Sequence, residues 1–534
     1  MTLIAPHQSP DAIAERAVAH LETVVRVESS SDERSETIPS TQGQIDLADL
    51  LAGFFADLGA TIERDAHANV IASLPGRGLR AEAPPLALLI HVDTARGTQP
   101  VDALTLHPAW DGAPLTYSAN AALRVGVEHY PALSAFVGQD ILHGPGDAPF
   151  GLDDKLGLSH LMTLAWLLHT NPDIPHPPLL LIGRPDEEIG RMEALLGLAD
   201  LMERRGVRSG FTVDGIEPYE INVENFNASQ GSVWFTPEAH PPVEGARALP
   251  LFIGGVNTHG ATAKAEGHRP ATRLAAEIFA RLTDEGLTPG RLRPLTFASD
   301  ALRDCDADIT ALAADPEAAE RLRAAVEEIV SPHVPRGASC RVGTFEDAPE
   351  VDPAHDKGAA LAALRFVTRF LSSDPGFPLS AEDSAAFEGY SQPYRLVADP
   401  LENAPDALRL DVRIRDFSPE GLAARERHLR DLVAEAHPTR FRAQYVNMGP
   451  RLADRPELIQ WARDAAEPLD VDARVLPIRG GTGVDPFLDK GIAIANLGTG
   501  YFAPESEKEL TSLQTMAGHA RWLLNLVQIA AAAR

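Results

Sequence analysis

Four short motifs between residues 91 and 214 contain the side chains best suited to chemistry. Each motif lies where an apolar run of strand length ends or where a helix begins, and together they contribute His91, Asp93, Asp153, Glu187, Glu188 and Asp214. Side chains at the carboxyl ends of parallel strands gather at one edge of an α/β sheet. Carboxylates so close together would repel one another unless a cation shared the space. The pattern therefore predicts a metal site.

Buried strands are predicted just before these side chains. Residues 86–90 and 179–182 are continuous apolar runs, which are typical of strands covered on both faces, and a third strand ends at Asp214. Because side chains alternate along a strand, His91 and Asp93 should point to the same side. A helix is predicted from Asp153 to His169, with further helices at 11–27, 44–58 and 515–532. The fold class is α/β.

Length and charge limit the classes of function. A chain of 534 residues is expected to contain two or three domains. The net charge of −29 argues against partners such as nucleic acid and anionic membranes, which would repel it. Two cysteines, Cys305 and Cys340, indicate a reducing compartment. With no predicted signal peptide or membrane span, we expect a cytoplasmic protein.

The middle of the chain has a different order of predicted strands and helices. After Asp214, short strand candidates alternate with helices in an α+β pattern, and the chain re-enters the first domain near residues 447–452. We therefore predict a catalytic domain from residues 1–228 and 449–534, with a second domain at 229–448 between its two parts. Residues 287–378 are predicted to be a helical insertion within that second domain.

Several motifs together resemble the peptidase T branch of the dinuclear zinc exopeptidases. They are His91-Val-Asp-Thr, Gly151-Leu-Asp-Asp-Lys, Pro185-Asp-Glu-Glu-Ile-Gly, Thr212-Val-Asp-Gly, Glu224-Asn-Phe-Asn-Ala-Ser, Thr262-Ala-Lys, Ile414-Arg-Asp-Phe and Pro477-Ile-Arg-Gly-Gly-Thr. They occur in the family's order over most of the chain. The resemblance implies a mixed, largely parallel sheet flanked by helices, with an inserted α+β lid and dimerisation domain.

The resemblance also implies a role for each candidate residue. The zinc ligands would be His91, Asp153, Glu188 and Asp214. Asp153 would bridge two zinc ions, Glu187 would be the general base, and Asp93 would hold His91 in its metal-binding orientation. His259, from the lid domain of a partner subunit in a homodimer, would stabilise the oxyanion. Arg415 and Arg479 would contact the substrate's carboxylate end.

The sequence departs from the family pattern at two places. The family's last metal-binding histidine is missing, and the corresponding position is Glu507 or Lys508, depending on the direction of counting. A glutamate can bind zinc, whereas a protonated lysine would oppose it, so we predict Glu507 as the substitute, with Lys508 or no ligand as the alternatives. His519 is a remote candidate. Gly483 replaces an acid in the family's Arg-Gly-Gly-Thr-Asp pattern, which could reshape the substrate pocket.

The expected function is hydrolysis of the N-terminal peptide bond of a short peptide, through a zinc-activated water and a glutamate base. One alternative is a related amidohydrolase that acts on N-acyl amino acids or other small amides, because one metal centre serves many substrates. Another is a non-catalytic binding protein with an incomplete metal site. The role of the insertion stays open.

Overall fold

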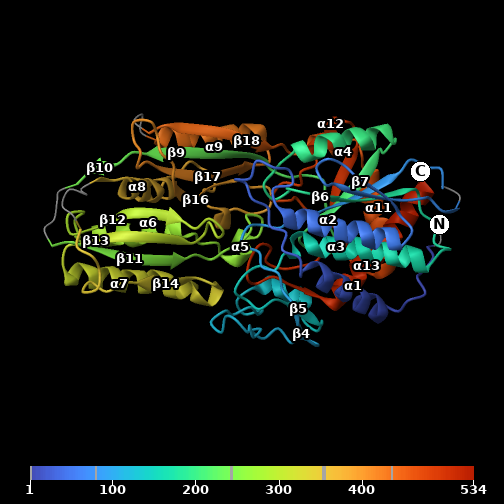
Figure 1. Ribbon diagram of the computed structural model, residues 1–534, viewed down its shortest axis with the longest axis horizontal. Coiled ribbons are helices and arrows are strands. Elements are labelled where there is room, and N and C mark those ends of the chain that lie inside the picture. Colours follow the sequence, from blue (N-terminus) through green and yellow to red (C-terminus); the bar gives the residue numbers. More distant parts are fainter. Residues whose placement is uncertain (1–2, 79–80, 241–244, 352–356, 434–436, 534) are drawn as a thin grey trace. The chain divides into compact units, whose positions relative to one another are not determined.

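The protein is described by a computed structural model that covers residues 3–78, 81–240, 245–351, 357–433 and 437–533. Figure 1 shows the chain coloured from its first residue to its last. It divides into two compact units: unit 1 is Met1–Asn120, Val125–Asn225 and Val446–Arg534, and unit 2 is Ala121–Arg124 and Phe226–Tyr445. The main boundaries lie close to those predicted at 228/229 and 448/449.

An eight-stranded sheet forms the centre of unit 1. In spatial order its strands are β1 (Thr61–Arg64), β2 (Val70–Leu74), β6 (Leu179–Arg184), β3 (Leu86–His91), β7 (Ser209–Gly215), β20 (Ala493–Gly498), β8 (Glu220–Asn222) and β19 (Arg474–Val475). Strands β6, β3, β7 and β20 are parallel, whereas β2 is antiparallel to β6 and β8 is antiparallel to β20. The predicted α/β fold with a mixed, largely parallel sheet is confirmed.

Helices cover this sheet, which explains the apolar sequence of its strands. Every residue of β3, β6 and β20 is buried, as expected for strands with both faces covered. The helices are α1 (Pro10–Val24), α2 (Gln42–Asp57), α3 (Leu152–Thr170), α4 (Glu193–Arg204), α10 (Gly449–Leu452), α11 (Glu457–Ala466), α12 (Asp485–Asp489) and α13 (Leu513–Ala533). Helix α3 contacts α1, α2, α13 and the sheet (Figure 1), so it is buried on nearly all sides.

A smaller sheet ties the end of the chain to the loop-rich segment before α3. It is antiparallel, in the order β21 (Leu510–Ser512), β5 (Ile141–His143) and β4 (Thr105–His107). This pairing places residues 500–510 beside the segment that leads into Asp153.

Unit 2 contains two four-stranded antiparallel sheets. The first is β12 (Leu292–Ser299), β13 (Ala307–Ala313), β11 (Arg247–Gly254) and β14 (Ser339–Val342), and the second is β16 (Tyr390–Ala398), β17 (Leu408–Asp416), β9 (Asn227–Phe235) and β18 (Thr439–Tyr445). A short pair joins β10 (Glu238–Ala239) to β15 (Lys357–Gly358). The helices are α5 (Ala263–Glu266), α6 (Ala271–Asp284), α7 (Pro316–Val330), α8 (Ala360–Leu371) and α9 (Pro419–Leu432). This is the α+β texture expected from the sequence.

The segment predicted as a helical insertion, residues 287–378, is not wholly helical. It contains α7 and α8, but also strands β12, β13 and β14, which complete a sheet with β11. The sequence of β13, Ala-Asp-Ile-Thr-Ala-Leu-Ala, is rich in alanine, so its composition favours a helix, and only pairing with its neighbours selects a strand. Amphipathic spacing also predicts a helix over 419–437. Its residues 434–436, like residues 352–356 of the insertion, lie outside the described residues.

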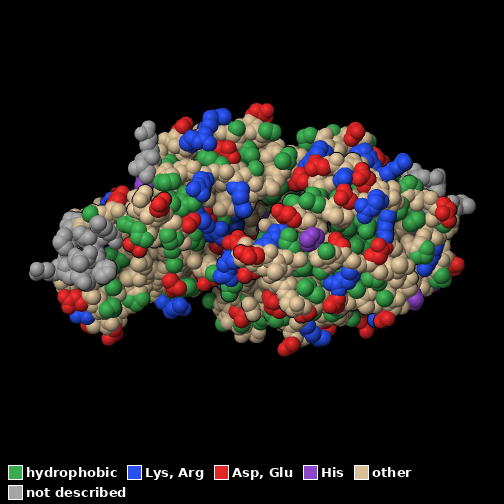
Figure 2. Space-filling view, turned by 45° about the horizontal axis from the view of Figure 1, so that its top comes forward, with side chains coloured by type: hydrophobic (Ala, Val, Ile, Leu, Met, Phe, Trp, Pro, Cys, Tyr) green, Lys and Arg blue, Asp and Glu red, His purple; other side chains and the backbone are tan. Residues whose placement is uncertain are grey.

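The described surface carries charges of both signs. Figure 2 shows acidic and basic side chains mixed over the displayed face. Within the part of the chain that the structure describes, no helix is long and apolar enough to cross a membrane. Cys305 is buried, Cys340 is half-buried, and the two are not joined by a disulfide.

Four buried histidines in unit 1 make a contribution to the free energy of unfolding that decreases in mild acid. Burial lowers the pKa of His20, His143, His160 and His176 to about 4 each. The unfolded chain therefore binds more protons than the folded chain between pH 6.5 and pH 4, so each histidine lowers the free energy of unfolding by up to about 3 kcal/mol over that window.

Buried carboxylates oppose this contribution, because the raised pKa values of Glu187, Glu220 and Glu509 make the folded chain bind protons over part of the same window. The histidine contribution is therefore measured as a difference between two chains. Relative to the unaltered chain, the melting temperature of a His176→Gln variant in chelator should rise as the pH falls from 7.5 to 5, because the variant lacks one titrating group. A difference in melting temperature that stays constant from pH 7.5 to pH 5 would contradict the prediction.

Candidate metal centre

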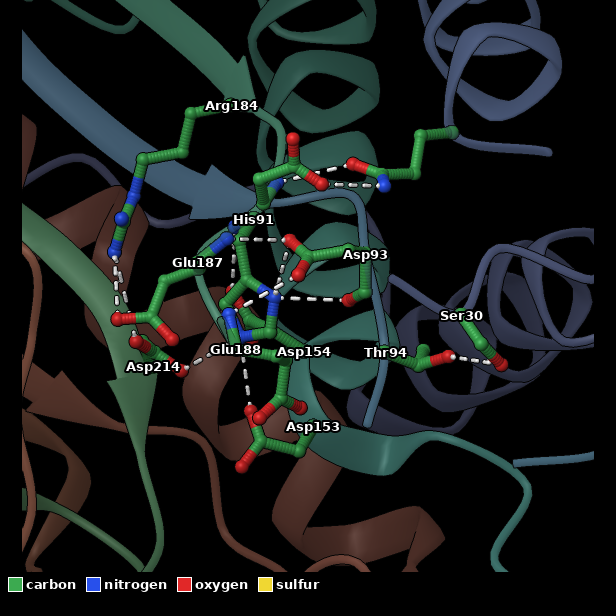
Figure 3. Close-up of polar contacts among 12 residues, drawn as sticks. Ser30, His91, Asp93, Thr94, Asp153, Asp154, Arg184, Glu187, Glu188 and Asp214 are labelled. Atoms are coloured by element: carbon green, nitrogen blue, oxygen red, sulfur yellow. Dashed lines mark hydrogen bonds and ion pairs between the residues drawn. The ribbon is translucent and has the colours of Figure 1, made fainter. Parts of the chain in front are cut away.

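The candidate side chains come from adjacent strand ends and from the start of one helix. His91 is the last residue of β3 and lies opposite Arg184, the last residue of β6. Asp214 lies near the end of β7, which pairs with β3 on its other side, and Asp153 lies in the first turn of α3. Figure 3 shows these side chains converging on one site at the carboxyl edge of the sheet.

The distances place four predicted ligands together. His91 Nε2 lies 2.9 Å from Asp153 Oδ1 and 3.3 Å from Asp214 Oδ1. Two groups have potential ligand atoms that all lie within 4.8 Å of one another: one is His91, Asp154 and Asp214, and the other is His91, Asp153 and Glu188. His91 belongs to both groups, so one imidazole links the two halves of the site.

The proton on His91 is fixed by its neighbour. Its Nδ1 lies 2.9 Å from the backbone carbonyl oxygen of Asp93 and 3.5 Å from the Asp93 carboxylate. A carbonyl oxygen can only accept, so Nδ1 carries a hydrogen, and Nε2 is the nitrogen that faces Asp153 and Asp214 and would bind a metal there once it has lost its own proton. This is the tautomer that binds a metal through Nε2. The predicted orienting role of Asp93 is thus served mainly by its main chain.

The Asp93 carboxylate has a different contact. Its two oxygens accept the backbone N–H groups of Glu187, at 2.9 Å, and Glu188, at 3.0 Å. Asp93 is fully buried, so these hydrogen bonds hold the loop that presents both glutamates. Asp93 therefore connects His91 to the predicted general base and to a predicted ligand.

We expect Asp93→Asn to weaken metal binding about 10- to 100-fold, because an asparagine amide has one oxygen and can accept only one of the two N–H groups. Competitive titration with a fluorescent chelator measures this. An affinity equal to that of the unaltered chain would show that the loop does not need both hydrogen bonds.

The electrostatics of the site favour a cation. Burial, followed by the charges of Glu505 and Asp153, holds the pKa of Glu188 well above its usual range. Burial and the charge of Asp214 do the same to Asp154. Glu188 Oε1 is buried and has no hydrogen-bond partner among the described residues. A divalent cation would satisfy that oxygen and offset the repulsion, so the donor set of imidazole nitrogen and carboxylate oxygens fits a metal ion.

Glu187 lies beside these ligands without belonging to either group. Burial raises its pKa to about 7, against the opposing effect of Arg184. A carboxylate with a pKa near neutrality can both take and return a proton at physiological pH. Its position and its proton affinity therefore suit the predicted general base.

The sequence reasoning missed three residues at the site. Asp154 directly follows Asp153, and its oxygens accept the backbone N–H groups of His91, at 3.2 Å, and Gly157, at 3.1 Å. The hydroxyl of Tyr501 donates to Asp153 Oδ2 at 3.0 Å. Arg184 could have been noticed, because it is the charged end of an otherwise uncharged strand.

Glu507 is not brought into either ligand group. It is buried, and its carboxylate lies 3.5 Å from Lys508 Nζ, which is also buried. Neither side chain belongs to the two ligand groups found among the described residues. His519 is part of α13 and stacks on Tyr219 with ring centroids 4.5 Å apart, as expected for a helix residue rather than a ligand.

The three predicted substrate-binding residues lie in different places. Arg479 is half-buried in unit 1 and follows Ile478, which bridges to Asn225. Arg415 belongs to β17 in unit 2, and its Nη1 donates to the backbone carbonyls of Ser229, at 3.2 Å, and Ile414, at 3.0 Å. His259 lies before α5 in unit 2, where its Nδ1 accepts the N–H of Ala261 at 3.3 Å. The structure does not test their roles.

Several known proteins with similar sequences are named Peptidase T. The chain is 25% identical over 506 residues to a protein named Peptidase T from Bacillus cereus, and the match covers 92% of each chain. It is 31% identical over 278 residues to Peptidase T from Bacillus thuringiensis, covering 51% of this chain and 61% of that one. No family model matches the chain.

Solved structures show the same fold. The aminopeptidase PepT from Bacillus cereus matches with a TM-score of 0.51 and 15% identity, covering 97% of this chain and 99% of that one. A tripeptidase from Staphylococcus aureus matches with a TM-score of 0.51 and 14% identity, over the same shares of the two chains. Along nearly its whole length the chain is thus similar in sequence to proteins named Peptidase T, and it shares its fold with the solved aminopeptidase PepT.

Proposed function

We propose that this protein is a metal-dependent aminopeptidase that hydrolyses the peptide bond next to the free amino terminus of a short peptide. The observation that carries the proposal is the pair of ligand groups that share His91, with Glu187 beside them. The names of its relatives, Peptidase T, aminopeptidase and tripeptidase, support the choice of a short peptide as substrate.

The metal would be held by the four predicted ligands. His91, Asp153, Glu188 and Asp214 present nitrogen and oxygen donors of the kind that bind zinc, and Asp153 is placed between His91 and Tyr501. A divalent ion bound there would lower the pKa of a water molecule and polarise the peptide carbonyl. Two zinc ions are the expected complement.

Glu187 would handle the proton. Its carboxylate accepts the proton that water loses during attack and returns it to the leaving amine, so that the product leaves as a neutral amine. The buried surroundings that raise its pKa to about 7 make both transfers possible at neutral pH. The Asp93 carboxylate accepts the backbone N–H of Glu187 and so keeps this glutamate in place.

In place of the family's last metal-binding histidine, which this chain lacks, we propose Glu505 as the ligand instead of the predicted Glu507. The backbone N–H of Glu505 donates to Glu509 Oε1 at 3.1 Å, and Glu509 Oε2 accepts the N–H groups of Phe150, Gly151 and Leu152, directly before Asp153. Glu505 is half-buried between buried neighbours. Among the neighbouring charges that raise the pKa of Glu188, the charge of Glu505 has the largest effect. Neither glutamate belongs to the two ligand groups, but the effect of the Glu505 charge on Glu188 and the link through Glu509 favour Glu505.

The two glutamates can be separated by counting metal. We expect Glu505→Gln to lose about one equivalent of metal per chain, whereas Glu507→Gln keeps the full complement; elemental analysis after dialysis gives the count. Because a group made mostly of carboxylates suits manganese as well as zinc, both ions belong in the reconstitution. Loss of metal from Glu507→Gln alone would restore the original assignment.

The remaining roles belong to the same proposal. Arg415 and Arg479 would bind the substrate's carboxylate end, and His259 from a partner subunit would stabilise the oxyanion in a homodimer formed through the second domain. Cytoplasmic location is consistent with two cysteines that are not joined in a disulfide.

A comparison of substrates tests the function. The purified protein, stripped with a chelator and reloaded with Zn²⁺ or Mn²⁺, is assayed against a tripeptide panel and an N-acetyl amino-acid panel. Metal-dependent release of the first residue from tripeptides is expected. Preference for N-acetyl amino acids would indicate the related amidohydrolase, and one metal equivalent or none without hydrolysis of any amide would indicate a binding protein.

A further inference from the structure

A buried arginine lies against the general base and one of the metal ligands. Arg184, at the end of β6, is only 2% exposed. Its Nη2 lies 3.5 Å from Glu187 Oε1 and 3.9 Å from Asp214 Oδ2, and Figure 3 shows the guanidinium extending from the strand toward both carboxylates. Taking a guanidinium out of water is costly unless its partners are well placed. A buried arginine at this position therefore calls for an explanation.

The backbone of a loop distant in sequence holds the guanidinium in place. Nη2 also donates to the carbonyl oxygen of Thr482 at 2.8 Å. The planar guanidinium cannot turn freely once this hydrogen bond is made, so its edge stays directed at Glu187. The Thr482 carbonyl and the Glu187 carboxylate thus share one nitrogen of Arg184.

Gly483 provides the space that the guanidinium occupies. A Cβ at this position would lie 2.5 Å from Arg184 Nη1 and 3.3 Å from Glu187 Oε1. The backbone at Gly483 also has a φ of +57°, which residues with a side chain rarely adopt. The sequence singled out Gly483 because it departs from an acidic family pattern, and here its missing side chain faces Arg184.

We propose that Arg184 is a positioning residue for Glu187 and that Gly483 makes that arrangement possible. This inference rests on the proposed function, in which Glu187 is the base. Asp93 fixes the backbone of Glu187, and Arg184 fixes its Oε1, which leaves Oε2 to accept the proton of the attacking water. A carboxylate held at both ends loses less conformational entropy on reaching the reactive geometry than one held only by its backbone.

The first test replaces the arginine. Arg184→Gln is expected to lower kcat about 10- to 100-fold on a tripeptide, while KM and bound metal stay within about twofold, because the base is displaced but the ligands are not. Arg184→Lys keeps the positive charge but lacks the planar guanidinium with its paired N–H donors, so it should recover part of the lost rate. Loss of metal from Arg184→Gln, or a rate equal to that of the unaltered enzyme, would overturn the proposal.

A double-mutant cycle separates positioning from general support of the fold. If Arg184 acts through Glu187, adding Arg184→Gln to Glu187→Gln should lower the residual kcat by less than about twofold. Independent losses that multiply would show that Arg184 acts elsewhere and would overturn the proposal. If the unaltered chain hydrolyses no amide, both the proposed function and this inference are wrong. If the unaltered chain is active but the rate losses of the two substitutions multiply, only this inference is wrong.

The glycine supplies the matched control. Gly483→Ala should lower kcat in the unaltered enzyme but have little further effect in Arg184→Gln, since the contact with the guanidinium is then gone. Gly206→Ala has a similar φ of +73° with nothing within 4 Å of the added Cβ, so it reports backbone strain alone and should leave kcat unchanged. Equal rate losses for Gly483→Ala with and without Arg184 would contradict the pairing of the two residues.

Discussion

Glu187→Gln is expected to lower kcat by about 10³-fold while leaving the bound metal in place. Glutamine keeps the size of the side chain but cannot take a proton from water. The metal stays because Glu187 belongs to neither ligand group, and its backbone remains held by Asp93. Single-turnover hydrolysis of a tripeptide, with elemental analysis of the same sample, measures both quantities.

A nearby glutamate gives the control for this experiment. Glu193 is exposed in the first turn of α4, so Glu193→Gln should change neither kcat nor metal content. Loss of metal from Glu187→Gln would instead identify Glu187 as a ligand. A variant that keeps both metal and full activity would leave the proton transfer to another group.

His91→Ala is expected to remove the metal and to lower turnover by more than about 10³-fold. The reason is that His91 Nε2 is the nitrogen donor common to both candidate groups, so the substitution removes it from whichever ion it binds. The remaining carboxylates would also repel one another more strongly, because no cation would lie among them. Elemental analysis and a tripeptide assay at saturating metal measure the two effects.

An exposed histidine provides the control for this experiment. His169 lies near the end of α3, away from the ligands, and His169→Ala should keep both metal and activity. A His91→Ala variant that still binds two equivalents would show that the carboxylates suffice. That result would also reject the assignment of His91 as the shared ligand.

Local sequence patterns predicted much of unit 1. The strands predicted at 86–90 and 179–182 are β3 (Leu86–His91) and β6 (Leu179–Arg184), because a continuous apolar run is a signal carried by neighbouring residues. His91, Asp153, Glu188 and Asp214 were also predicted from sequence. They meet because parallel strands end at one edge of the sheet, a rule that depends only on fold class.

Other features depend on contacts between distant residues. Strand β13 has an alanine-rich sequence that favours a helix by itself, but pairing with β11 and β12 makes it a strand. The choice between Glu505 and Glu507 is of the same kind. Two residues apart in a loop, they differ only in what each faces, and Glu507 lies against Lys508 whereas Glu505 is tied through Glu509 to the turn before Asp153.

The α/β class, the candidate metal ligands at the strand ends and the proposed general base were all predicted from sequence, since these follow from motifs that are short and continuous. Two other features became apparent only in the folded chain: the contact between His91 and the main chain of Asp93, and the contact of Arg184 with Glu187 opposite Gly483. Residues 184 and 483 are distant in sequence, and no local pattern records that the side chain of one fills the space left by the other. Close packing between distant segments fixes such pairs.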